Sequence, residues 1–85
     1  MYDDIISHAP KQAQKRIRVY VETVEHEETP ESLRELYGVA DIKELVQHLV
    51  EYECGTPYVE NDQLISDYRV FWSTLDKMYG EGNYP

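Results

Sequence analysis

Three histidines are the residues in this chain whose chemistry could serve a metal site or acid–base catalysis. They are His8, His26 and His48. Two histidine ligands on one helical face need a spacing of four residues, and no pair among these three has it. The sequence also lacks the ligand spacing of known zinc sites. We therefore expect surface histidines and predict that the protein binds neither a metal nor another cofactor.

The hydroxyl and thiol groups lack the neighbours that nucleophilic catalysis requires. No serine is flanked by the glycines of a nucleophile elbow, and the four glycines are too dispersed to form a phosphate-binding loop. The single cysteine, Cys54, has Glu51 and Glu53 close by, whose negative charge disfavours a thiolate, so a half-buried, unreactive side chain near a helix end is expected. These absences predict that the protein is not an enzyme.

Carboxylates dominate the charge of the chain. Seventeen acidic residues stand against eight basic ones, for a net charge of −9. Half of the basic residues lie at Lys11, Lys15, Arg16 and Arg18. The remaining sequence is strongly anionic, and we expect all of its acids on polar faces or in loops. Such a surface repels phosphate backbones and anionic membranes and attracts basic proteins.

The first long element predicted is a helix over residues 10–26. Ala13, Ile17, Tyr20 and Val24 would share one helical face, and Pro10 suits a first helical position. The β-branched residues between positions 16 and 24 also alternate as in a strand, so a strand over 16–24 is the main alternative. Good helix formers at positions 11–16 favour the helix.

Two helices are predicted next, separated by Gly38. The first begins at Thr29 and Pro30, a capping residue followed by a proline at the first helical position, and turns Leu33, Leu36 and Tyr37 inward. The second begins at Asp41, with Glu44 completing an acidic variant of the capping box. Its apolar residues follow the spacing of an amphipathic helix without a fault: Ile42, Leu45, Val46, Leu49 and Val50.

A last helix begins near Asn61 or Asp62 and ends at Gly80. Its expected apolar stripe is Leu64, Ile65, Tyr68, Phe71, Trp72, Leu75 and Met78. No repeat, linker or low-complexity segment divides the chain. The sequence therefore predicts one all-α domain over residues 1–85, a compact bundle of about four short helices.

The two middle helices resemble a helix-turn-helix over about twenty residues, with Gly38 as the turn. Arg34 stands where that motif has a small residue, and Glu44 stands where its second helix has an apolar one. The second helix would present a net anionic face to DNA: Asp41, Lys43, Glu44, Gln47, His48 and Glu51. Because of the resemblance, the alternative function is a small transcriptional regulator or adaptor. It would dimerise through Tyr68, Phe71 and Trp72.

The leading hypothesis is stoichiometric binding of a basic protein, because eight tyrosines accompany the carboxylates and a domain this small cannot bury them all. Tyrosine rings supply contact area, and carboxylates meet arginines and lysines. The expected binding residues form two groups: Glu25, Glu27, Glu28, Glu31 and Glu35 near Pro30, and Glu51, Glu53, Tyr58, Glu60 and Asp62 near Gly55.

This profile is similar to that of phage-encoded inhibitors of host defence, anti-CRISPR proteins included, and of toxin immunity proteins. The function expected is a nucleic-acid mimic that blocks a nuclease or nucleic-acid-binding protein, as a monomer or homodimer. We expect no direct contact with nucleic acid and none with a membrane. The lone cysteine and the acidic start fit the cytoplasm, which would be that of the host if a phage encodes the protein.

Overall fold

The computed structural model describes residues 2–55 and 62–80, apart from the side chain of Asp62, and every regular element in these ranges is helical. The elements are α1 (Asp3–Ile6), α2 (Lys11–Glu27), α3 (Pro30–Tyr37), α4 (Ile42–Glu53) and α5 (Asp62–Tyr79). The prediction of an all-α bundle is thus confirmed, with four helices of eight or more residues and one short turn, α1.

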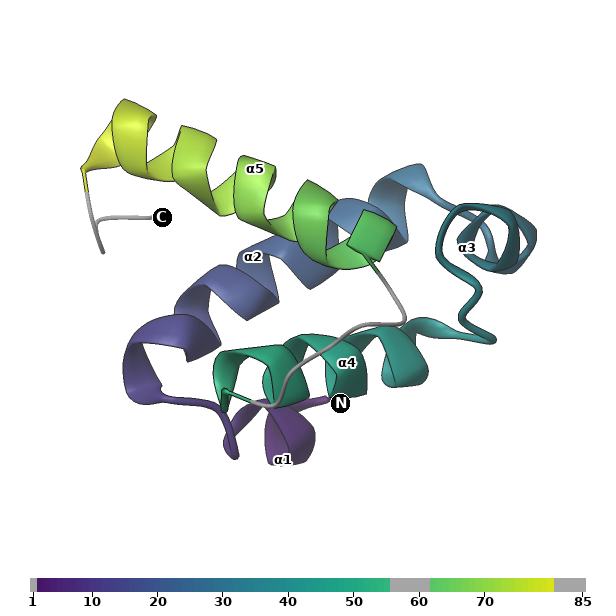
Figure 1. Cartoon of the computed structure of the whole chain (residues 1–85), viewed down its shortest axis with the longest axis horizontal. Coiled ribbons are helices and arrows are strands. Elements are labelled where there is room, and N and C mark those ends of the chain that lie inside the picture. The colour runs from purple at the N-terminus through teal and green to yellow at the C-terminus, as the bar shows by residue number, and fades with distance from the viewer. Residues whose placement is uncertain (1, 56–61, 81–85) are drawn as a thin grey trace.

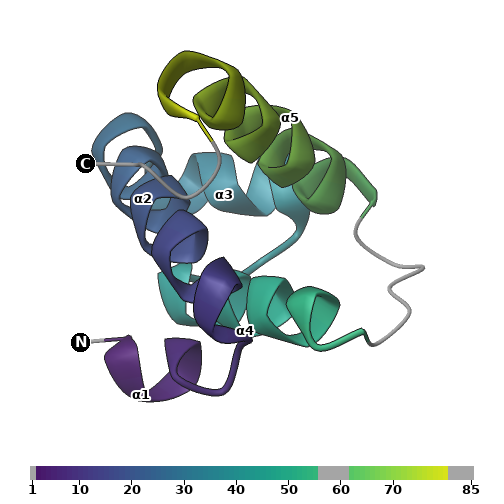
Figure 2. The same cartoon turned by 90° about the vertical axis from the view of Figure 1, so that its left-hand side faces the viewer.

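The helices are stacked across the molecule, with α1 and α4 on one side, α5 on the opposite side, and α2 and α3 between them (Figures 1 and 2). Helix α2 packs against α1, α4 and α5, while α3 packs against α5. Because α2 touches elements on both sides, it is the central support of the bundle.

Residues 16–24, for which a strand was the alternative prediction, belong to helix α2. Ile17 is fully buried and Tyr20 is 4% exposed, as the helical spacing predicted. Burying such a side chain is worth roughly 1.5–3 kcal/mol, more than the few tenths that a β-branched residue costs in a helix. Thr23 also accommodates the helix, because its hydroxyl donates a hydrogen bond of 2.9 Å to the carbonyl of Val19, one turn earlier.

Helices α3 and α4 begin where the predicted capping residues stand. The Thr29 hydroxyl accepts a hydrogen bond from the backbone of Ser32, whose own hydroxyl accepts one from the Thr29 backbone, so Ser32 completes the capping box. At α4, Asp41 accepts from the backbone of Glu44, and the Glu44 carboxylate accepts from the backbone of Ala40. These bonds satisfy backbone donors that a helix start leaves unpaired.

The core lies between α2, α4 and the first half of α5. Its fully buried side chains include Ile17, Leu45, Val46, Leu49, Leu64 and Tyr68. Leu36 was expected to point inward and does not, since it is 47% exposed. Met78, on the predicted stripe of α5, is 66% exposed. Cys54 is exposed as well, where a half-buried side chain was expected.

Candidate functional site

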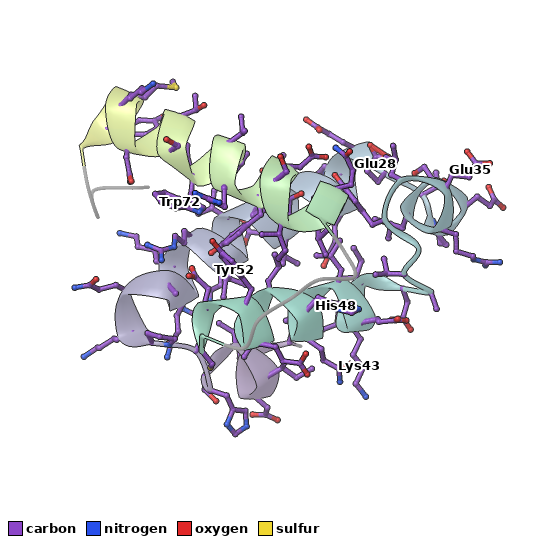
Figure 3. The ribbon with its side chains drawn as sticks, in the orientation of Figure 1. Glu28, Glu35, Lys43, His48, Tyr52 and Trp72 are labelled. Atoms are coloured by element: carbon purple, nitrogen blue, oxygen red, sulfur yellow. The ribbon has the colours of Figure 1, made fainter. Side chains whose placement is uncertain are left out.

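The first predicted group of acids lies at one end of the molecule, around the connection between α2 and α3. We call Glu25, Glu27, Glu28, Glu31 and Glu35 the acidic end. Figure 3 shows Glu28 beside the start of α5 and Glu35 on the outer side of α3. Glu28 is half-buried and the other four are exposed, and none of the five pairs with a cation of the described ranges. Their charge therefore faces solvent without internal compensation.

Only part of the second predicted group lies within the described residues. Glu51 is exposed on α4, whereas Glu53 is turned into the bundle with a side chain only 9% exposed. Asp62 is the first residue of α5, and Tyr58 and Glu60 lie outside the described residues. Glu53 also contradicts the expectation that every acid would lie on a polar face or in a loop.

Glu53 belongs to a polar cluster that joins α2, α4 and α5. The Arg16 guanidinium donates to both carboxylate oxygens of Glu53, at 2.6 and 3.0 Å, and lies 4.8 Å from the centre of the Trp72 ring. The Tyr68 hydroxyl donates to the same carboxylate at 2.6 Å. Burial and this hydrogen bond raise the pKa of Tyr68, and the Glu53 carboxylate raises the pKa of Arg16. The cluster supports the bundle from inside. Arg16 is therefore not part of the exposed basic surface formed by its neighbours in sequence.

A groove between α2 and α5 adjoins the acidic end. It has a volume of about 520 Å³ and is closed on one side by Tyr37 of α3. Its apolar lining is Tyr20, Val24, Val70, Phe71, Leu75 and Met78. Glu27, Glu28 and Asp67 line it too, and none of the lining residues that the structure describes is a lysine or arginine. Two residues of the acidic end thus border an apolar surface, an arrangement suited to protein binding.

Hydrogen bonds fix the polar edge of this groove. The Tyr37 hydroxyl donates to Asp67 at 2.8 Å and lies 3.4 Å from the Tyr20 hydroxyl, while Gln63 donates to the other oxygen of Asp67 at 2.9 Å. Burial and the contact with Tyr37 raise the pKa of Tyr20, and burial raises that of Tyr37. Both phenols therefore stay neutral, and the negative charge at this edge rests on carboxylates.

The sequence did not indicate the groove. Val70 falls between the polar residues of α5, and its 65% exposure can be known only once the helices are docked. An apolar residue away from the main stripe was the available signal. Within residues 2–55 and 62–80, Tyr79 is the one tyrosine in the exposed class, at 46%, while three others are half-buried and Tyr20 and Tyr68 are buried.

The charges of α2 oppose its helix dipole. Lys11 and Lys15 stand near its amino end, and Glu25 and Glu27 stand near its carboxyl end. Because a helix favours anions at its amino end and cations at its carboxyl end, each of these glutamates costs up to about 1 kcal/mol. Helix stability therefore does not explain why the acids stand there.

We expect Glu25→Gln with Glu27→Gln to raise the free energy of unfolding by about 0.5–1 kcal/mol at low salt, because both changes remove charge that opposes the dipole. Glu31→Gln is the matched control, since Glu31 lies in the first turn of α3, where the dipole favours an anion. It should have the opposite sign. Urea unfolding at low and high salt measures both, and equal signs would contradict the dipole explanation.

The helix-turn-helix alternative rests on α3, Gly38 and α4. Gly38 ends α3 in a left-handed conformation, with φ of 67°, as expected of a glycine turn. The face of α4 that would meet DNA surrounds a shallow hollow of about 480 Å³. Its lining comprises Asp41, Lys43, Glu44, Gln47, His48 and Glu51. Three carboxylates against one lysine make this face repel phosphates.

Comparison of the chain with protein-family models, curated proteins and solved structures finds no match. Within the described residues, no group of three or more potential metal ligands gathers, and no helix is long and apolar enough to cross a membrane.

Proposed function

We propose that the protein acts by stoichiometric protein–protein binding and that its acidic end imitates the anionic surface of nucleic acid. The partner is a basic nuclease or nucleic-acid-binding protein, whose groove the protein occupies. The function is thus that of an inhibitor or immunity-type protein, similar in kind to anti-CRISPR proteins. The observation that carries the proposal is the set of five carboxylates at one end, on α2, α3 and the residue between them, none of which pairs with a cation within residues 2–55 and 62–80.

Two features support this use of the acidic end. Glu25 and Glu27 stand at the carboxyl end of α2, where the helix dipole disfavours an anion. Acids in such a place are expected where a charge serves binding at the expense of stability. The basic residue Arg16 has a structural role, because its charge is paired with that of Glu53 and does not offset the charge of the exposed acids. The net charge of −9 is therefore concentrated on the surface and favours approach to a basic partner.

The test is capture of a partner from a cell lysate at low salt by the immobilised protein. We expect a nuclease or nucleic-acid-binding protein that salt releases and that DNA or RNA displaces. The triple variant Glu25→Gln, Glu31→Gln and Glu35→Gln should weaken binding of that partner by about tenfold to a hundredfold at low salt, because each charge pair contributes to association.

The matched control raises the net charge by the same three units away from the acidic end, through Asp4→Lys with Gln12→Lys, both at exposed positions. It should retain most of the affinity. Equal losses of affinity in the two variants would show that net charge alone causes the effect. Capture of nucleic acid itself would contradict the proposal and favour the regulator.

A further inference from the structure

The groove between α2 and α5 offers a partner more than charge. Val70 is 65% exposed and Met78 is 66% exposed, and both line the groove from α5, about two helical turns apart. Phe71 and Leu75, which are half-buried, complete the apolar lining on α5, and the nearly buried Tyr20 and Val24 of α2 form its floor. Exposed apolar side chains gathered in a concave surface indicate a binding site, whereas single ones do not.

The charges around the groove indicate the sign of its occupant. Glu27 ends α2, Glu28 follows it directly and Asp67 belongs to α5, and no cation is among the described residues that line the groove. An anionic occupant, such as a nucleic acid or an anionic membrane, would be repelled. A second copy of this chain would bring a net charge of −9 and the same three carboxylates. The complementary occupant is apolar on one side and positively charged at its edge.

We propose that the groove binds an amphipathic basic helix of the partner protein. Its apolar side chains would pack against the exposed Val70 and Met78, and its lysines or arginines would meet Glu27 and Glu28. An apolar groove between helices is a common receptor for such a helix. The proposal rests on the proposed function, because it names the element of the basic partner that this protein binds.

The test uses a peptide of about 15 residues, long enough to be helical when bound, with leucines at helical spacing and lysines elsewhere. The chain has two methionines, so methyl-labelled methionine gives two signals, and Met78→Leu identifies that of Met78. We expect the peptide to bind with one-to-one stoichiometry and to shift the Met78 signal. A scrambled peptide of the same composition, which has no apolar face, should bind at least about tenfold more weakly.

Two variants separate the groove from general attraction to an acidic protein. Val70→Asp should weaken peptide binding about tenfold or more, because it places a charge within the apolar lining. Leu36→Asp is the control, since Leu36 is 47% exposed on α3 and does not line the groove. It should leave the affinity within about twofold. Circular dichroism checks that both variants fold, as expected for exposed positions.

The inference would be overturned by no peptide binding, by binding without a shift of the Met78 signal, or by equal affinities of the Val70→Asp and Leu36→Asp variants. A Met78 shift that follows protein concentration without peptide would assign the groove to self-association and overturn it too. The capture experiment changes Glu25, Glu31 and Glu35, which do not line the groove. Failure of the peptide test with salt-sensitive capture intact would therefore remove this inference alone.

Discussion

Replacing Arg16 with Met is expected to lower the free energy of unfolding by about 3 kcal/mol, because it leaves the Glu53 carboxylate buried without its cation. The side chain of Glu53 is 9% exposed and receives two hydrogen bonds from the Arg16 guanidinium, its only cation among the described residues, and a third from the Tyr68 hydroxyl. A domain of 85 residues has a total stability of about 0.1 kcal/mol per residue, so this variant should lose a large fraction of it. Urea unfolding followed by circular dichroism measures the change.

Arg18→Met is the matched control. Arg18 also pairs with a carboxylate, that of Asp3 at 3.3 Å, but the two side chains are 47% and 71% exposed. The expected loss is within about 0.5 kcal/mol, since exposed ion pairs contribute little. Similar losses for Arg16→Met and Arg18→Met would show that burial of the pair does not matter.

A second variant distinguishes the loss of an ion pair from the loss of packing. Arg16→Met with Glu53→Leu removes both charges but leaves the Tyr68 hydroxyl buried without the acceptor that it now uses. Adding Tyr68→Phe removes that unpaired group as well. The triple variant should recover to within about 1 kcal/mol of the original protein, because buried ion pairs can be replaced by apolar side chains at little cost. If the triple variant did not recover, the stability would depend on the geometry of the cluster and not only on the pairing of its polar groups.

Raising the pH above about 10 is expected to unfold the protein cooperatively. Tyr20 and Tyr68 are 4% and 0% exposed, and burial raises the pKa of both above the ordinary value. The folded state therefore keeps at least these two phenolic protons after the unfolded chain has released them, and Tyr37, whose pKa burial also raises, adds to them. The free energy of unfolding should fall by at least about 2.7 kcal/mol per pH unit in this range, about 1.36 for each proton.

Tyrosinate absorbance and circular dichroism, recorded together, measure this effect. The part of the absorbance change that belongs to Tyr20 and Tyr68 should coincide with the loss of helix, because these buried phenols ionise only on unfolding. Tyr68→Phe should make the fall in stability less steep by one proton. Titration of all tyrosines before any loss of helix would contradict the assignment of Tyr20 and Tyr68 as buried, neutral groups.

Local features of the fold could be predicted because they depend on neighbours in sequence. The caps at Thr29 and Asp41, the stop at Gly38 and the spacing of apolar residues in α4 are all short-range patterns. The helical periodicity of α2 proved a better guide than its β-branched composition, since Ile17 and Tyr20 had to reach the same core. The place of the acidic end followed from the same helices.

Features that depend on how helices dock could not be predicted. Arg16 and Glu53 are 37 residues apart, and nothing in a single sequence distinguishes this pair from the other acids and bases. Leu36 and Met78 follow helical apolar spacing, yet no neighbouring helix covers them enough to bury them. The groove depends on how α2 and α5 are docked, so its lining could be known only from the structure.

The continuity of α2 has a consequence for the thermodynamics of association. One unbroken helix runs from Arg16, Ile17 and Tyr20 in the core to Glu25 and Glu27 at its end. A partner that binds there meets a backbone that is ordered before contact. The entropy cost of association then comes from fixing side-chain rotamers, about 0.5–1.5 kcal/mol for each glutamate, and not from ordering a loop. Such a preorganised surface favours tight binding from a small contact area.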